Sequence, residues 1–444
     1  MSQLSRVCVL LLFIYGCSHT SDPVSCSFSL DEKGKIVQFE SVDRFPMGNK
    51  PRVAQLADER KAGKYRPNPD PRDSDIFLRA ASSVQIIKSS KDRSIQFLVA
   101  QDSRRKLGVV DLSLKKKGTT ISTFPIAKKS QIQRFEDDRR DYKTFRKKHK
   151  VDFEAMTTLP TGEILTLSSG SDIDKMKKGE PTFRSLGVIT QQNGRDYQSY
   201  DLSGFYSYLQ EKKELIGGPH EGEPAVLNIE GVSLRKNRSG YIISFFHRGN
   251  MNNNGHNGMV EFDFSQWYQL LSQSTLGNPL EAKLWESLTP LNIKTFDFPM
   301  IANLDDPNGS STPLTLNDAI FGKIGGVSSY IIPVGAEADF IDSQGNHQDG
   351  VVTFAGLAVW KSGDDLRGDK CVIIQAAKDP EPGKPSIYGK TEGLTAIQWL
   401  GSRDPVEQHH FSLSEPLYGV TDIDSEVTPS VLSVIKLPTE LETL

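Results

Sequence analysis

Short runs rich in hydrophobic and β-branched residues recur along most of the chain. Examples are SIQFLVAQ, KLGVVDLSL, YIISFFHRG, SSYIIPVGA and SVLSVIKL. Gly, Pro, Asn, Asp or charged residues bound each run, which is typical of β-strands separated by turns. Only residues 205–215 and 265–274 carry a helical pattern, and strands do not alternate regularly with helices. The pattern therefore predicts an all-β protein and disfavours a parallel α/β sheet.

A short motif repeats at the start of several predicted strands: an acidic residue, then Gly or Ala. Its acids are Glu154, Glu230, Asp318 and Glu392, and Ser82 takes the same place in a degenerate first copy. A second strand that ends in polar residues follows each copy, and further strands follow in most. Repeated groups of antiparallel strands are the signature of a propeller. We therefore expect a single β-propeller of five four-stranded antiparallel blades with short helical insertions, with a sixth blade in 26–80 or in the insertions left open.

The last repeat has only three clear strands. The N-terminal segment KIVQFESV (35–42) supplies a fourth next to SVLSVIKL. Closing the ring in this way removes exposed strand edges. The expected domain is thus a propeller over residues 35–440.

Residues 1–16 have the pattern of a signal peptide, because the apolar run VCVLLLFIYG is too short to span a bilayer. The run ends in IYGC, and Cys17 resembles the lipidated cysteine of a bacterial lipobox. Residues 17–34 would then be a lipidated N-terminus and linker, and the membrane would be a partner through the lipid. Ser18 favours the outer membrane, at its periplasmic or surface face. The alternative is a secretory signal with a chance cysteine.

The net charge and the cysteines limit the possible partners and metal sites. The formal net charge of −3 argues against a general nucleic-acid binder. After removal of the signal and lipidation, Cys26 and Cys371 are left in an oxidising compartment, where a disulfide between them stays open. No CxxC motif and no Cys/His cluster occurs, so a zinc site is disfavoured.

In a propeller blade the first strand lines the axis. The four motif acids would therefore converge at one end of it, inside a second ring of polar residues: Asp102, Ser169, Ser171, Arg248, Glu337 and Asp422. Gly or Ala after the acid leaves room where inner strands crowd together. Converging carboxylates repel one another and need a cation. Ca²⁺ suits an oxygen-rich pocket, and Arg248 is the alternative. A purely structural reading stays open, in which each acid accepts backbone N–H groups and joins blades.

Other candidates are weaker. His256 lies in an Asn/Gly-rich turn, His220 in a loop, and residues 128–150 carry both signs of charge. His409 and His410 are adjacent, so on a strand they would face opposite sides and not share a site.

Several quoted runs carry a family resemblance: DFEAMTTLPTGEILTLSSGS, LNIEGVSL with HRGN, LTLNDAI with GAEAD, and KTEGLTAIQW. Together they resemble a bacterial family of unknown function that is related to phytase-like propellers and to "esterase-like activity of phytase" propellers. The resemblance covers about residues 76–436. It implies a propeller but no reaction, and no GxSxG nucleophile motif occurs.

Two functional hypotheses follow. The first is a lipid-anchored binding or scaffold protein for an unknown small molecule or protein, with an axial Ca²⁺. The second is a metal-assisted hydrolase of phosphate esters, lactones or other esters, in which axial carboxylates hold the metal and one activates water. Whether the protein is an enzyme stays open, and catalytic residues are unknown.

Overall fold

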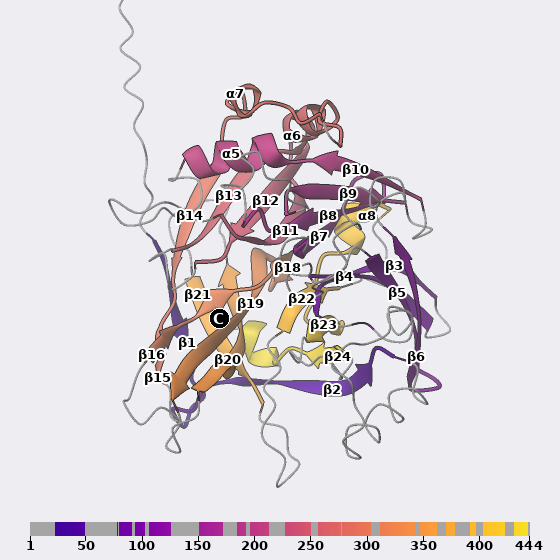
Figure 1. The fold of residues 1–444 in the computed structure, drawn as a ribbon. Coiled ribbons are helices and arrows are strands. Elements are labelled where there is room, and N and C mark those ends of the chain that lie inside the picture. Colours follow the sequence, from indigo (N-terminus) through magenta and orange to yellow (C-terminus); the bar gives the residue numbers. More distant parts are fainter. Residues whose placement is uncertain are drawn as a thin grey trace, which may run out of the picture.

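The structure is a computed structural model and describes the chain in separate stretches (Figure 1). These are residues 23–48, 78, 80–90, 94–102, 106–125, 151–171, 184–191, 196–212, 227–249, 256–276, 278–302, 311–341, 347–361, 370–377, 391–396, 403–421 and 430–442. The described part is all-β with a few short helices, as the sequence predicts.

Two four-stranded antiparallel units come first. The first has the order β3-β4-β5-β6, with strands Ala81–Ser89, Ser94–Gln101, Lys106–Ser113 and Gly118–Pro125. The second has the order β7-β8-β9-β10, with strands Phe153–Thr158, Ile164–Ser168, Leu186–Thr190 and Tyr197–Asp201. In both units the strands pair in chain order, as consecutive hairpins do.

Three further antiparallel units follow. The third is β11-β12-β13-β14, with strands Ile229–Lys236, Tyr241–His247, Asn257–Asp263 and Asn292–Asp297. In the fourth, β17 and β18 both pair with β19, which leads to β20 and β21: Thr315–Leu316, Ile320–Ile324, Val327–Ile341, His347–Lys361 and Lys370–Ala376. The fifth has β22 (Thr391–Thr395), β23 (Leu417–Thr421) and β24 (Val431–Lys436). A small pair, β15 (Met300–Ala302) and β16 (Ser311–Pro313), stands apart.

The N-terminal strands β1 (Val24–Phe28) and β2 (Gln38–Pro46) join three of these units. β1 lies parallel to β14 and then to β21, while β2 starts parallel to β21 and continues antiparallel to β24. β2 overlaps the segment 35–42 that the sequence places in this position. We call β1 and β2 together the strap, because they turn the third, fourth and fifth units into one continuous 14-stranded sheet.

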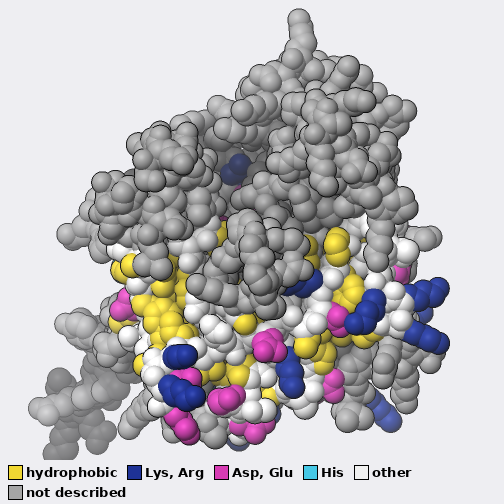
Figure 2. All heavy atoms as spheres, turned by 90° about the horizontal axis from the view of Figure 1, so that it is seen from below, with side chains coloured by type: hydrophobic (Ala, Val, Ile, Leu, Met, Phe, Trp, Pro, Cys, Tyr) yellow, Lys and Arg dark blue, Asp and Glu magenta, His cyan; other side chains and the backbone are white. Residues whose placement is uncertain are grey.

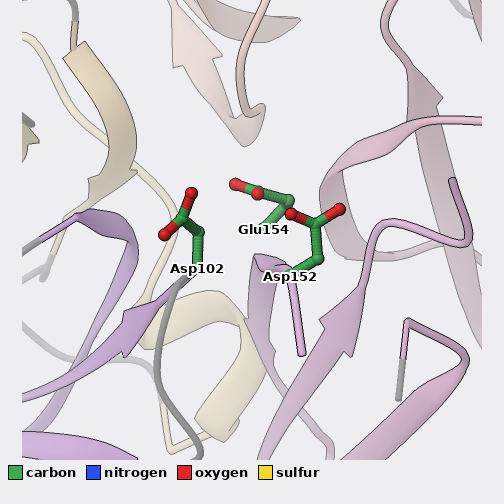
Figure 3. Close-up of side chains that lie close together, drawn as sticks. All are labelled: Asp102, Asp152 and Glu154. Carbon is green, nitrogen blue, oxygen red and sulfur yellow. The ribbon is translucent and has the colours of Figure 1, made fainter. Parts of the chain in front are cut away.

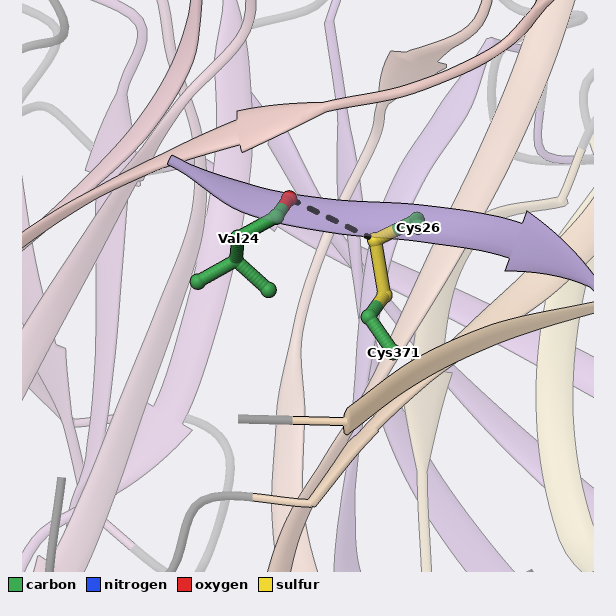
Figure 4. The surroundings of a disulfide bond; sticks show 3 residues. All are labelled: Val24, Cys26 and Cys371. Carbon is green, nitrogen blue, oxygen red and sulfur yellow. Dashed lines mark hydrogen bonds between the residues drawn. A yellow bond between two sulfur atoms is a disulfide. The ribbon is translucent and has the colours of Figure 1, made fainter. Parts of the chain in front are cut away.

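A disulfide fastens the strap. Cys26 of β1 is bonded to Cys371 of β21, its direct partner in the parallel register (Figure 4). Both cysteines are buried and belong to the apolar core between the third and fourth units. The bond therefore ties the first described strand to a strand that lies 345 residues further along the chain.

Five hydrophobic clusters lie between neighbouring units. One contains Leu98 of β4 and Met156 of β7, and joins units one and two. The others join units two and three, three and four, four and five, and finally five and one, where Phe97 packs against Tyr418. The apolar contacts of the described residues thus return to their starting point and close a ring.

A few short helices accompany the strands. α5 (Ser203–Glu211) and α6 (Phe264–Leu271) match the two predicted helical segments, whereas α7 (Ala282–Trp285), α8 (Pro405–Gln408) and the 3-10 helix η5 (Thr439–Glu442) have no such signal. None of the described helices is long and apolar enough to cross a bilayer. On the face shown in Figure 2, the described Lys and Arg side chains are mixed with Asp and Glu, and hydrophobic side chains lie between them.

Candidate functional site

The five motif residues, Ser82, Glu154, Glu230, Asp318 and Glu392, occupy one structural position, which we call the marker position. In four units the register between the first two strands shifts at this residue, as between Ile229 and Gly231. In the fourth unit one more residue separates Leu316 from Ile320 than separates their partners Val334 and Ile331. A β-bulge inserts one extra residue and re-aims its side chain. The repeated bulge therefore turns each marker side chain away from its regular position in the pleated strand.

The glycine after a marker permits close contact between units. A Cβ on Gly231 would lie 2.9 Å from Ala319 N, beside the marker Asp318. A Cβ on Gly393 would lie 2.5 Å from Ser83 Cα and 3.1 Å from Ser82 O. The shortest distance at each glycine, 2.9 Å and 2.5 Å, is too short for a real side chain, so the first strands approach one another through their backbones. The first strands β3, β7, β11, β18 and β22 thereby form the inner ring, and we call its marker end the acid end.

Arg248 follows β12 and lies at the acid end. Its Nη1 is 3.5 Å from Glu230 Oε1 and its Nη2 is 3.7 Å from Glu337 Oε2. Burial lowers the pKa of Arg248, but the charges of Glu230, Glu337, Glu392 and Glu154 outweigh burial and raise the pKa above its usual value. The structure thus brings three marker acids and Glu337 around one guanidinium.

Glu230 has a second partner in the residue that precedes β11. Asn228 Nδ2 donates to Glu230 Oε1 at 2.7 Å, and the backbone N–H of Asn228 donates to Nδ1 of the buried His247 at 3.1 Å. Burial lowers the pKa of His247 to about 4, so the ring is neutral at pH 7. A neutral imidazole with an acceptor at Nδ1 carries its proton on Nε2.

Asp318 differs from the other markers. Its Oδ1 accepts the backbone N–H of Ala319 and its Oδ2 that of Leu394, both at 2.8 Å. Burial raises the pKa of Asp318 well above its usual value, the two N–H donors oppose the rise, and Glu230 and Glu392 add to it. Asp318 therefore joins the fourth unit to the fifth, which is the structural reading that the sequence left open.

Three acids, one of them the marker Glu154, form a second group (Figure 3). Asp102, Asp152 and Glu154 each offer one carboxylate oxygen, and these oxygens lie within 4.8 Å of one another. Asp152 is buried and adopts a left-handed backbone with φ of 60°. Its Oδ2 accepts the hydroxyls of Ser169 and of Ser171, the latter at 3.0 Å, and lies 3.7 Å from Arg184 Nη1. This group combines oxygen donors from the ends of β4, β7 and β8.

The structure brings together only some of the polar residues that the sequence places in a second ring around the motif acids. Backbone N–H groups of Asp102, Ser169 and Arg248 donate to the carbonyls of Ala80, Asp152 and Asn228, which each stand two residues before a marker. These three positions are thus equivalent in the first three units. Glu337 joins them through Arg248. Asp422, Cys17, His220 and the stretch 128–150 lie outside the described residues.

One expectation was wrong. His409 and His410 do not lie on a strand: His409 is the C-cap of α8, His410 follows it, and both line one small cavity. The turn after a short helix permits two adjacent side chains to reach the same space. His256 is exposed at the edge of the described stretch that starts with it.

Sequence reasoning missed Asp152, Arg184, Asn228 and His247. A signal for two of them exists in retrospect, because Asp152 and Asn228 both stand two residues before a marker. Arg184 has no such signal, since it reaches Asp152 from the far side of a long connection.

Residues 78–295 match the "Family of unknown function (DUF6929)", a stretch that contains the first two units and the third as far as β14. No curated protein matches the chain.

Among solved structures, an exo-1,5-α-L-arabinanase from a bovine ruminal metagenomic library is 8% identical with a TM-score of 0.33, covering 81% of this chain and 93% of its own. An α-L-arabinofuranosidase from Lactobacillus brevis is 8% identical with a TM-score of 0.31, covering 80% of this chain and 91% of its own. The β-propeller domain of Vanderwaltozyma polyspora Nup133 is 10% identical with a TM-score of 0.30, covering 78% of this chain and 72% of its own. Scores this low support no inference about activity or substrate.

Proposed function

We propose that the chain is an extracytoplasmic, lipid-anchored five-bladed β-propeller that binds a cation-containing ligand at its acid end. Five antiparallel units, five cores between neighbouring units and an inner ring of first strands support this architecture. The strap supplies the fourth strand of the last blade through β2, and so removes the edge of β24.

One observation carries the binding proposal: oxygens of Asp102, Asp152 and Glu154 lie within 4.8 Å of one another beside the Arg248 group. At the acid end, four acids (Glu154, Glu230, Glu337 and Glu392) interact with the guanidinium group of Arg248, and Asp152 lies beside Arg184. Asp102 adds a further carboxylate next to Asp152 and Glu154. An excess of carboxylates in a partly buried site favours a positive ligand. We therefore assign a cation, rather than a free anion, to this end.

The donor set fits Ca²⁺. This ion takes six to eight oxygen ligands in flexible geometry, and three carboxylates provide oxygens of the right kind, to which water adds. Ser169 and Ser171 hold Oδ2 of Asp152, which fixes the orientation of that carboxylate. Zn²⁺ is a poorer fit, because it prefers nitrogen and sulfur donors and none is present in the group.

A binding or scaffold role is the first reading of this site. Metal-assisted hydrolysis of a phosphate ester, lactone or other ester is the second. Solvent access supports this hydrolase reading, because the side chains of Arg248 and Glu337 at the acid end are 20% and 29% exposed. A bound cation supplies Lewis acidity. The chain's own part would be to orient the substrate through Arg248 and to accept a proton at Glu154.

Elemental analysis and an activity screen separate the two readings. The protein purified without chelator should contain one equivalent of Ca, which Asp152→Asn should lose. The matched control Asp111→Asn, an exposed acid bonded to Gln96, should keep it. Hydrolysis of p-nitrophenyl esters, phosphate esters or lactones that EDTA and Asp152→Asn both abolish would establish the hydrolase. A purified protein without any metal, and without Ca²⁺ uptake on dialysis, would contradict the binding proposal.

The anchor is a separate part of the proposal. It rests on the IYGC sequence at Cys17. Bacterial lipoproteins carry several acyl chains, so attachment should be stable. Cys17→Ser should release the protein from membranes or block its processing. Unchanged membrane association, with no acyl group on the mature N-terminus by mass spectrometry, would contradict the anchor.

A further inference from the structure

A small cavity lies on the inner ring further along the strands than the markers. Gln85, Thr157, Ser233 and Phe321 line it, and each stands three residues after a marker. Thr395 holds the same place in the fifth unit, and its Oγ1 donates to Gln85 Oε1 at 3.2 Å. The axis thus carries a ring of acids and then a ring that is mostly of buried, uncharged polar side chains.

Residues 404–411, which we call the gate segment, complete the wall of this cavity through Val406, His409 and His410. The segment belongs to the connection between β22 and β23, yet it is attached to other units. Asp404 Oδ2 accepts from Lys236 Nζ and from the Tyr241 hydroxyl, both at 2.8 Å, in the third unit. Phe411 N donates to Phe321 O at 3.1 Å in the fourth. The segment therefore crosses from the fifth unit to the third and fourth, and α8 lies against β11 (Figure 1).

The two histidines are the part of this attachment that is most costly to charge. The edge of the His410 ring meets Phe321, with centroids 4.9 Å apart, and His410 Nε2 lies 3.4 Å from Leu234 O. His409 Nδ1 is buried and makes no hydrogen bond within the described residues. Charging an imidazole in such surroundings costs free energy, because burial disfavours the charged form.

We propose that the gate segment opens the axial cavity when His409 and His410 are protonated. Val406 and the two imidazoles form one wall of this cavity. An acidic compartment or surface would thus change access to the axis from the end opposite the acids. This inference does not depend on a bound cation.

The charges around the histidines are consistent with opening at low pH. Burial lowers the pKa of both to about 4, and the charge of His410 lowers the pKa of His409 further. A backbone hydrogen bond opposes the shift of each, with Ala396 for His409 and with Leu234 for His410. Glu407 and Asp404 also oppose the shift of the His410 pKa, whereas Lys323 adds to it. Lys236 and Tyr241 face Asp404, and Arg235 lies over the Phe321 ring, paired with Glu261. Because the closed-state pKa is below that of a free imidazole, closure is fully favoured above about pH 6.5 and weakens as the pH falls toward 4. At pH 5 the opening equilibrium should shift by about 30-fold per histidine.

Hydrogen exchange read by mass spectrometry tests the gate. Peptides covering 403–411 should lose about 30-fold or more in protection between pH 7 and pH 5, after correction for intrinsic exchange, while peptides from β19 should not change. His409→Gln with His410→Gln keeps polar, uncharged side chains, and should reduce the change to less than threefold. If the double variant does not fold by circular dichroism, the two single variants should each remove part of the change. Constant protection of 403–411 at pH 5 would overturn the gate, as would an equal loss in the Gln variants or in β19.

Discussion

Oδ2 of Asp318 accepts the backbone N–H of Leu394 at 2.8 Å, and this bond connects two neighbouring units across the inner ring. The other oxygen accepts Ala319 N, so both acceptors are used by the backbone. Glu230, at the same position of the preceding unit, bonds instead to Asn228 and Arg248. The same marker position thus serves two purposes: Asp318 joins neighbouring units, and the glutamates lie around Arg248.

The first prediction concerns this junction. Asp318→Ala should lower the free energy of unfolding by about 2–4 kcal/mol, because two buried N–H groups lose their acceptor. Asp318→Asn should cost less, since one carbonyl oxygen is kept. Urea unfolding followed by fluorescence measures both.

The pH dependence of the same variants follows from the raised pKa of Asp318. A carboxyl whose pKa is higher in the folded state contributes most below its unfolded value, and the contribution is lost as the pH rises through the folded pKa. The loss caused by Asp318→Ala should therefore be larger at pH 5 than at pH 8. An equal or smaller loss at pH 5 would show that Asp318 is ionised in the native protein.

The second prediction concerns backbone contact. A Cβ at Gly393 meets Ser83 Cα at 2.5 Å, and neither backbone is free to move without shifting a whole strand. Gly393→Ala should destabilise the protein by about 2 kcal/mol or more, within the range for overpacking. Gly118→Ala is the control, because its nearest atom would be 3.9 Å away. Similar melting temperatures for the two variants would show that the inner strands are not in contact.

Much of the fold could be predicted because the marker is a local signal. An acid followed by a small residue, at the start of an apolar run, indicates the start of the inner strand, whereas the bulge at this residue is seen only in the structure. The fourth unit was the hardest case, since Asp318 stands between two short strands, β17 and β18, rather than inside one. The parallel pairing of β1 with β14 and β21 has no local signal, because its partners lie hundreds of residues away.

The site was predictable only where it repeats. Glu154, Glu230, Glu392 and Arg248 follow the repeat and lie together. Arg184 does not follow it, and nothing in the local sequence indicates that it lies beside Asp152. The strand assumption for His409 and His410 failed for a related reason: α8 is a single turn, too short to leave a periodic pattern.

The third prediction concerns the charge balance at the acid end. Arg248→Met leaves Glu230 and its neighbouring carboxylates without their guanidinium, which should destabilise the protein by about 3 kcal/mol at pH 7. Lowering the pH to 5 should restore part of the loss, because protonation removes repulsion. Arg238→Met, which removes an exposed arginine, should change little. A loss that is as large at pH 5 as at pH 7 would mean that Arg248 acts through packing and not through charge.

The fourth prediction concerns the strap. Cys26→Ala with Cys371→Ala should lower the free energy of unfolding by about 2–5 kcal/mol, because the bond closes a very long loop. Deleting residues 38–46 should cost more, since it removes the partner of β24 and opens the ring. Thermal unfolding of the oxidised, reduced and truncated proteins gives the ranking. A truncated protein that melts like the intact one would place ring closure elsewhere.

The central claim is that the acid end binds a cation, and calorimetric titration of Ca²⁺ into metal-free protein tests it most directly. We predict one site per chain, a large loss of affinity in Asp152→Asn, and unchanged binding in Asp111→Asn. Bound Ca²⁺ at a hundredfold excess over its dissociation constant should also stabilise the fold by about 2.7 kcal/mol. No heat of binding in the wild-type protein, or equal binding in Asp152→Asn, would contradict the claim and leave the carboxylates at this end with a structural role alone.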